Sequence, residues 1–233
     1  MRIKKVVIPF MLIMTMAFPV VANAMPRKLV TLDGGKNYVM QHMSNWCWVA
    51  AGVNIFVAID KDVPTNKSEE DFLLDMAKYA VDNSDRIEPF PDSPGASDLG
   101  RYNVEAGLTE TAVIANKLFR ENRYPQLYYK VIKTKQGKAV VKDFEWLLDD
   151  LIRGYSNAIW LSPTANTPDE FDSSHIVLLN GADSDWDDPI DYDVRVFEPN
   201  RGSNIWVIYD QLIDGSYSKL KYRRYEGTCG VDN

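Results

Sequence analysis

The chain has 233 residues and a formal net charge of -7, with 33 acidic and 26 basic side chains. Nucleic acid and anionic lipid surfaces repel an acidic chain, which argues against either as a partner. Its two cysteines and two histidines have no zinc-ligand spacing, and no Gly-rich phosphate loop is present. The sequence therefore predicts a protein that uses no metal and no cofactor.

Residues 1–24 have the pattern of a secretory signal peptide. Basic residues near the start are followed by an apolar run over 6–21 and by Ala-Asn-Ala at 22–24, an A-x-A cleavage pattern. An uncleaved membrane anchor is the alternative, but the run is short for a bilayer span. We expect a secreted or periplasmic protein without stable membrane insertion after cleavage. Its mature domain covers 25–233, and loss of the three cations in the leader changes the net charge from -7 to -10.

The first part of the mature chain is predicted to be mostly helical. Residues 25–40 are expected to form an extended arm with a turn at 33–35. A buried helix follows from Cys47 to about residue 59, because the sequence there is apolar on almost every side. The other elements predicted up to residue 154 are a helix opened by the capping box 68–71, a long loop over 83–107, a helix capped by Thr109, a strand over 126–132 and a helix over 140–153.

Two of these segments carry interpretations beyond their secondary structure. The long loop over 83–107 is either a wall of a cleft or a plain surface excursion. The acidic side chains of the last helix are interpreted as a solvated face; they are Asp143, Glu145, Asp149 and Asp150.

From residue 157 the pattern changes to short runs rich in β-branched and aromatic residues. The predicted strands cover 158–161, 175–179, 192–197 and 205–209. Helices thus dominate about 41–154 and antiparallel strands about 157–225, which predicts the α+β class. The residues after 225 are interpreted as a polar tail. A disulfide is the alternative for an exported protein, but Cys229 in such a tail is a poor partner for Cys47 in a buried helix.

The most informative stretch surrounds Cys47, which lies between two tryptophans. Ser44 and Asn45 precede it and are both good helix N-caps, so we expect the cysteine in the first turn of the buried helix. Unpaired backbone N–H groups and the positive end of the helix dipole meet there and favour the nucleophilic thiolate. Gln41 lies six residues upstream, where its amide could donate to a developing oxyanion.

This stretch resembles the nucleophile segment of papain-like cysteine peptidases, and in particular of bacterial secreted and effector-type groups. The resemblance implies a helical lobe that carries the cysteine, packed against an antiparallel sheet lobe. It implies an oxyanion hole made by Gln41 and the Cys47 N–H. It further implies a histidine and an orienting residue from the later, strand-rich part of the chain.

His42 and His175 are the only two candidates for the imidazole base. His42 belongs to the same local segment as Cys47, which makes a productive geometry difficult, so it is interpreted as a loop or cleft wall. His175 opens a predicted strand and follows Ser173 and Ser174. In the order of the chain it matches the position of the base in papain-like enzymes. A strand-end histidine satisfied by solvent is the alternative.

The residue that orients the imidazole should lie on the next strand, which ends in Glu198-Pro-Asn-Arg-Gly202. Several papain-like enzymes carry an aspartate where this chain has Glu198, and others use an asparagine, for which Asn200 is the candidate. Glutamate is one methylene longer than aspartate but can do the same electrostatic work. The alternative for both residues is a simple turn, because Pro-Asn-x-Gly favours turns in any protein.

Three functions remain open from the sequence. The first is a thiol endopeptidase that cleaves polypeptides through an acyl-enzyme. Only some twenty residues separate the leader from the cysteine motif, so such an enzyme is either narrow in specificity or controlled by a separate inhibitor or immunity protein. The second is deamidation or transglutamination of a partner protein's glutamine at the same thiol. The third is a binding module on an inactive peptidase scaffold. Trp160 and Trp206 are expected to contribute to the substrate pocket.

Overall fold

The computed structural model describes residues 28–32, 36–60, 62–63, 65–91, 93, 95–133, 138–169, 173–184 and 192–231. The predicted leader at 1–24 and the predicted turn at 33–35 lie outside these ranges. Within them, no helix combines the length and the apolar character that crossing a bilayer requires.

One antiparallel sheet forms the middle of the molecule, with the strand order β2-β7-β3-β4-β5-β6. The strands are β1 Lys28–Thr31, β2 Tyr129–Val131, β3 Asn157–Ser162, β4 His175–Ser184, β5 Tyr192–Glu198, β6 Ser203–Ile208 and β7 Arg224–Val231. Strand β1 also pairs with β4, opposite Gly181 to Ser184, beyond the point where β3 begins opposite Leu179.

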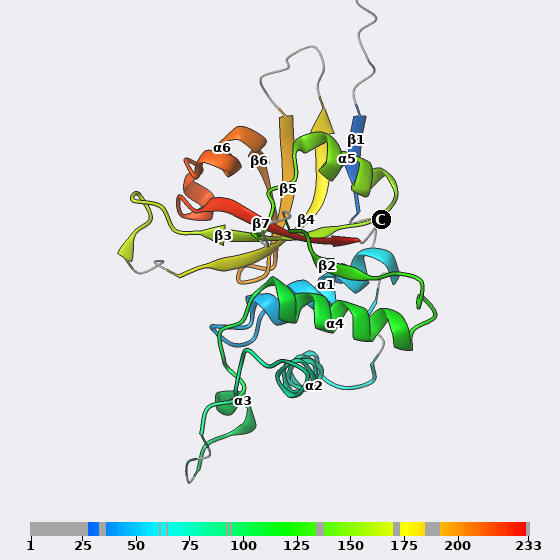
Figure 1. Ribbon diagram of the computed structural model, residues 1–233, viewed down its shortest axis with the longest axis vertical. Helices are drawn as coiled ribbons and strands as arrows, with labels where there is room; N and C mark the ends of the chain where they lie inside the picture. Colours follow the sequence, from blue (N-terminus) through cyan, green and yellow to red (C-terminus); the bar gives the residue numbers. More distant parts are fainter. Residues whose placement is uncertain are drawn as a thin grey trace, which may run out of the picture.

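Helices cover both faces of this sheet (Figure 1). They are α1 Cys47–Asp60, α2 Glu69–Asp82, α3 Asp98–Arg101, α4 Leu108–Glu121, α5 Phe144–Ile152, α6 Tyr209–Asp214 and the short 3₁₀ helix η2 Ser218–Leu220. Helices α1 and α4 pack on one face with α2 outside them, while α5 and α6 pack on the other. The predicted α+β class is therefore confirmed as mixed helix and antiparallel sheet.

Each face of the sheet has its own apolar core, as strand alternation requires. Along β4, Ile176 and Leu178 pack with α1 and α4, whereas Val177 and Leu179 pack with α5 and α6. Helix α1 is the centre of the first core, and every residue from Cys47 to Ala58 in it is buried. The apolar run that predicted a buried helix is thus explained by a helix enclosed between the sheet and α4.

Several element boundaries differ from those predicted. Helix α2 begins as expected, with the Ser68 hydroxyl accepting from the Asp71 N–H. Helix α4 begins earlier than predicted because Glu110 reaches back and accepts the Gly107 N–H at 3.1 Å, so Thr109 lies inside the first turn and is not the cap. The strand predicted over 126–132 is only β2, and the last predicted strand ends before Tyr209, which opens α6.

The acidic face predicted for α5 is wrong at one of its four positions, Asp150, since the other three side chains are exposed. Asp143 is the N-cap of the helix and accepts the Trp146 N–H at 3.0 Å. Asp150 is 3 % exposed and forms an ion pair with the equally buried Lys142. Asn157 donates to the same carboxylate at 3.0 Å. A buried charge requires such partners, and sequence periodicity alone does not reveal a partner on another element.

The predicted polar tail is also wrong, because residues 224–231 form β7, an inner strand between β2 and β3. Its two glycines are explained by close neighbours: a Cβ at Gly230 would lie 2.3 Å from the Asn157 Oδ1. Cys229 is completely buried, and both cysteines are free thiols. Short side chains therefore reflect tight packing here, and not solvent exposure.

Gly52 marks the closest approach of α1 to α4. A Cβ at this position would lie 2.8 Å from the Thr111 carbonyl oxygen and 2.9 Å from the Ile114 Cβ. We expect Gly52→Ala to lower the free energy of unfolding by about 2 kcal/mol, since the two helices must separate to admit the methyl group. Chemical denaturation measures this loss.

Gly100→Ala in α3 is the matched control. A Cβ at Gly100 would have the Ser97 Oγ as its nearest neighbour, at 3.5 Å, so we expect an unchanged denaturation midpoint for this variant. Equal effects in the two variants would contradict the packing argument.

Candidate active site

One end of the sheet collects several polar side chains that are distant in sequence. Neighbouring strands are antiparallel, so β4 begins, at His175, at the same end where β5 finishes, at Glu198. Strand β7 is separated from β4 by β3 alone and runs in the same direction as β4, so Arg223, just before β7, lies at this end too. The N-terminus of α1 meets this end of the sheet.

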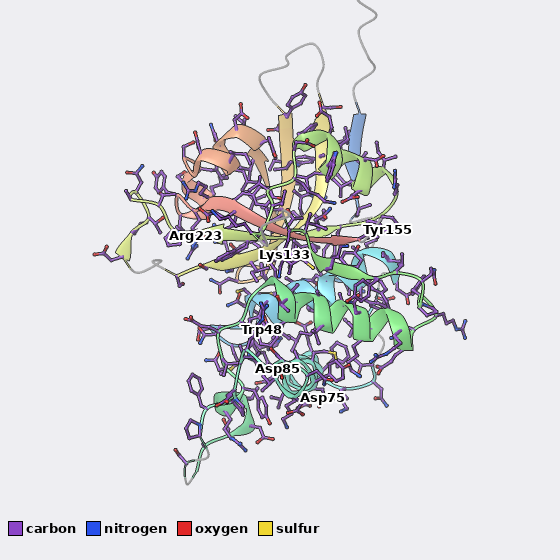
Figure 2. The ribbon with its side chains drawn as sticks, in the orientation of Figure 1. Trp48, Asp75, Asp85, Lys133, Tyr155 and Arg223 are labelled. Carbon is purple, nitrogen blue, oxygen red and sulfur yellow. The ribbon has the colours of Figure 1, made fainter. Side chains whose placement is uncertain are left out.

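The two tryptophans that flank Cys47 fix the start of α1. The Trp46 indole donates to the Tyr102 carbonyl at 2.8 Å, and the Trp48 indole donates to the Val104 carbonyl at 3.0 Å. Both side chains are fully buried, and Figure 2 shows Trp48 in the helical layer next to the sheet. A buried indole requires an acceptor. These two hydrogen bonds therefore hold the segment 102–104 against the residues on both sides of Cys47.

Asn103, between those two carbonyls, holds the residues that precede the helix. Its Oδ1 accepts the Asn45 N–H at 3.0 Å, and its own carbonyl accepts from the Asn45 Nδ2 at 2.9 Å. Its Nδ2 donates to the Ser44 Oγ at 3.1 Å. The far end of the predicted long loop thus positions the cysteine segment. Within that loop, only Glu105 and Ala106 are among the described residues that line the pocket in front of Cys47.

His175 lies between Glu198 and Cys47. Its Nε2 is 2.6 Å from the Glu198 Oε1, and the thiol of Cys47 is within hydrogen-bonding contact of the ring. Because a carboxylate only accepts, Nε2 must donate to Glu198. This leaves Nδ1 as the nitrogen that faces the sulfur. The ring is 12 % exposed and the Glu198 side chain 8 %, so water competes little for either bond.

His175 and Glu198 each stabilise the charged form of the other. Burial by itself disfavours the imidazolium, but the attraction of Glu198 and the hydrogen bonds to Cys47 and Glu198 exceed that effect and raise the pKa of His175 to about 10. Burial likewise opposes ionisation of Glu198, yet the charge of His175, its hydrogen bond and the Asn200 N–H together lower the pKa of that carboxyl. At neutral pH the structure therefore holds an imidazolium beside the thiol and a carboxylate behind it.

Asn200, the second candidate for orienting the histidine, contacts Glu198 instead. Its backbone N–H donates to the Glu198 Oε1 at 3.0 Å, and the residue lines the pocket. The turn chemistry of this segment is also present, with the Arg201 N–H donating to the Glu198 carbonyl at 3.1 Å. The segment therefore forms a turn and also orients Glu198. The backbone N–H of Asn200, within the turn, holds the Glu198 carboxylate in position.

Gln41 lies on the pocket wall, but its amide is already engaged. The Nε2 donates to the Met43 and Ser44 carbonyls, both at 3.2 Å. Its Oε1 is buried and makes no hydrogen bond within the described part of the chain. In this arrangement neither amide hydrogen points toward an oxyanion, so that role would require one of the two bonds to be given up. The Cys47 N–H, in the first turn of α1, belongs to the backbone donors that a helix leaves without an intrahelical partner.

The segment that carries Gln41 is held from two sides. Asn54 in α1 exchanges two hydrogen bonds with the backbone of Val39, at 2.8 and 2.9 Å. The Gln41 N–H donates to the Pro199 carbonyl at 3.0 Å. The extended segment therefore connects the nucleophile helix with the turn that follows Glu198, which fixes their separation.

The pocket in front of Cys47 has a volume of about 520 Å³. Its lining includes Gln41, Cys47, His175, Glu198 and Asn200, so the described structure brings all five predicted site residues together. His42 lies outside this lining and pairs with Glu69 at 3.0 Å on the surface. The two tryptophans expected in the pocket are absent from the lining: Trp160 packs against the first apolar core, and Trp206 is exposed on β6.

Sequence reasoning missed four cationic side chains that line this pocket, namely Arg201, Lys219, Lys221 and Arg223. A signal for three of them was present, since the run Lys-Leu-Lys-Tyr-Arg-Arg over 219–224 is strongly basic in an acidic chain. The run was not interpreted because nothing in the sequence shows that it precedes an inner strand and therefore lies at the active end of the sheet.

The two cysteines should differ sharply in reactivity. Cys47 is 9 % exposed and lines the pocket, whereas Cys229 is completely buried, and burial raises the pKa of the Cys229 thiol to about 12. At about pH 7, where an ordinary thiol is mostly protonated, we expect iodoacetamide to label one thiol per folded chain and both in denaturant. Peptide mapping by mass spectrometry identifies the labelled residue. Labelling of Cys229 in the folded protein would contradict this prediction.

Comparison with known proteins adds no assignment, because no family model and no curated protein matches this chain. No group of three or more histidine, cysteine or carboxylate side chains suited to a metal ion occurs among the described residues.

Proposed function

We propose that this protein is an exported thiol hydrolase of the papain-like type, which cleaves peptide bonds through an acyl-enzyme. The observation that carries the proposal is the position of His175, bonded to Glu198 at 2.6 Å on one side and in contact with the Cys47 thiol on the other. A nucleophile, a base and an orienting carboxylate in this order are the arrangement that acyl transfer requires. They face a pocket of a size that accommodates side chains of a substrate.

The proposed reaction begins with the thiolate of Cys47 and the imidazolium of His175. The sulfur attacks the carbonyl carbon of the scissile bond, and the Cys47 N–H donates to the oxyanion that forms. Such a donor typically contributes about 3 kcal/mol. The proton on the Nδ1 of His175 passes to the amine as the C–N bond breaks. Water then attacks the thioester and gives its proton to His175, which releases the carboxylic acid and restores the thiolate.

The helical lobe of the proposed papain-like arrangement is α1, α2 and α4, and the sheet supplies the other wall. Cys47 at the N-terminus of α1 and His175 at the start of β4 lie where the two meet. The chain differs from the pattern in using glutamate for orientation. The Glu198–His175 bond supports the proposed orienting role of this glutamate.

The experiment compares cleavage with the other reaction that the same thiol supports. The protein, without residues 1–24, is incubated with casein and with a mixed peptide library, and the products are read by mass spectrometry. New chain termini are expected. Glutamines converted to glutamates, or joined to amines, without new termini would replace cleavage by deamidation or transglutamination. An absence of both products, with no labelling of Cys47 by a thiol-directed epoxide, would reject the proposed chemistry altogether.

A further inference from the structure

The described lining of the pocket in front of Cys47 has more basic than acidic side chains, although the chain as a whole has a net charge of -7. Its described lining contains Arg201, Lys219, Lys221 and Arg223 against the carboxylates Glu105 and Glu198. Glu198 is already paired with the imidazolium of His175. Among the described lining residues, basic side chains therefore outnumber carboxylates where a substrate would meet the sulfur.

We propose that this pocket recognises a carboxylate of the polypeptide substrate, located close to the bond that is cleaved. This proposal rests on the proposed function and names the class of substrate for it. The carboxylate comes from an acidic side chain or from a free C-terminus, since the two present the same charge and geometry.

Arg223 is the central residue of this carboxylate site. It is 7 % exposed, and its charge is close enough to act on both Glu198 and Cys47. Its Nε donates to the Ser173 carbonyl at 3.0 Å, which fixes the plane of the guanidinium two residues before His175 in the chain. Burial lowers the pKa of Arg223, so enclosing its charge is unfavourable unless anions are near. A planar guanidinium held in this way is suited to bind a carboxylate through two parallel hydrogen bonds.

The backbone before Arg223 is held in an uncommon conformation. Lys221 and Tyr222 are consecutive non-glycine residues with φ values of 59° and 56°, in the left-handed region. Such a pair persists only where the surroundings enforce it. Here the Tyr222 carbonyl accepts from the Thr164 Oγ1 at 2.6 Å and from the Thr167 Oγ1 at 2.9 Å, and its N–H donates to the Tyr217 carbonyl at 3.2 Å.

That turn determines where the cations lie. It follows η2, which carries Lys219, and it leads directly into β7. Lys219, Lys221 and Arg223 alternate in sequence, and all three line the pocket. Figure 2 shows Arg223 just before β7. A chain that entered β7 in an extended conformation would not need two left-handed residues. We therefore infer that the turn serves to place the three basic side chains beside Cys47 and His175.

The test uses peptides that differ only in charge. Each sequence from the library is made with Glu or Gln next to the cleaved bond, and with a C-terminal carboxylate or amide. We expect the peptides that carry a carboxylate to show a kcat/KM about 10-fold higher, chiefly through KM, as for attraction between opposite charges. A preference for Glu over Gln identifies a side chain as the source, and a preference for the free acid over the amide identifies the C-terminus.

The variants Lys219→Gln and Lys221→Gln are combined, because Lys219 is exposed and Lys221 partly exposed, so neither supports the core. The double variant is expected to lose the preference, so that the ratio of kcat/KM for carboxylate and neutral peptides falls about 10-fold, toward one. Lys67→Gln is the control, since Lys67 pairs with Asp75 at the surface and lies outside the pocket lining. Arg223→Lys keeps the positive charge but cannot donate two parallel hydrogen bonds to a carboxylate. This variant should retain only part of the preference for carboxylate peptides.

A second measurement does not depend on turnover. Iodoacetate is anionic and iodoacetamide is neutral, and the ratio of their rates of alkylation of Cys47 reports the charge of the pocket. We expect this ratio to fall about 10-fold in the Lys219/Lys221 double variant and to stay constant in Lys67→Gln. Equal cleavage of neutral and acidic peptides, with an unchanged ratio, would overturn the carboxylate site and leave the hydrolase proposal standing. If no peptide is cleaved at all, the hydrolase proposal fails, and the ratio still decides whether the pocket selects anions.

Discussion

Replacing Cys47 by serine is expected to lower kcat/KM for peptide cleavage by at least about 10⁴-fold, although the two side chains are similar in size. The reason lies in the protonation state of His175, whose pKa is raised to about 10. Glu198 keeps the imidazole protonated at neutral pH, so it cannot accept the proton of a serine hydroxyl. The site is suited to a nucleophile that ionises readily, and a thiol does so whereas an alcohol does not.

Cys229→Ala is the matched control for this variant. Cys229 is buried in β7 and takes no part in the pocket, so its loss should leave kcat/KM within about 2-fold. Removing the sulfur from the core should lower the free energy of unfolding by about 1 kcal/mol. Both variants are assayed with the same peptides after their folding is checked by circular dichroism. Cleavage by Cys47→Ser at a rate near that of the unaltered protein would show that another nucleophile acts.

The second large effect is expected from Glu198→Gln. In the unaltered protein kcat/KM should fall only above about pH 10, because His175 loses its proton there. Glutamine keeps the shape of the side chain but removes the charge that raises this pKa. The pH above which kcat/KM falls should therefore move down toward the ordinary histidine pKa of about 6.5, and kcat/KM at pH 8 should fall by about 30-fold.

Asn200→Ala is the control for this pH profile. Asn200 bonds Glu198 through its backbone N–H, which the substitution retains, so the alkaline limb should stay near pH 10. The profiles are measured as kcat/KM between about pH 5 and pH 11. An alkaline limb at the same pH in Glu198→Gln and in the unaltered protein would contradict the role assigned to the carboxylate.

The same pair should make stability depend on pH in a defined direction. The pKa of His175 is raised on folding, so its stabilisation is complete below its ordinary value of 6.5 and is lost as the pH rises toward about 10. The pKa of Glu198 is lowered, so its stabilisation is present above its ordinary value of 4.5 and is lost as the pH falls below it. Denaturation curves of the unaltered protein and of Glu198→Gln should therefore differ most between these two values.

The parts of the site that sequence reasoning could find are those set by local chemistry. The start of α1 at Cys47 follows from residues that cap helices and from the apolar run behind them. The position of His175 at the first residue of β4 follows from β-branched neighbours after two serines. Glu198 ends β5 where a turn motif begins. Each of these features is determined within a few residues, and for that reason it is visible in the sequence.

The parts that sequence reasoning missed depend on partners from other elements. Asp150 has the periodicity of a solvated helix face, yet Lys142 and Asn157 enclose it. Gln41 has the expected place on the pocket wall, but its amide bonds to loop carbonyls whose direction no motif specifies. Arg223 becomes part of the site only because β7 is inserted next to β3. Pairing between distant strands is the step that local patterns do not encode.

The place of β7 in the sheet also determines when the proposed active site can be complete. This strand comes last in sequence among the strands described, yet it lies between β2 and β3 and completes both. Until residues 224–231 have been synthesised and inserted, those two partners have unpaired edges and the basic segment before β7 has no fixed position. A growing chain would therefore carry the Cys47 thiol long before the pocket in front of it has its basic wall.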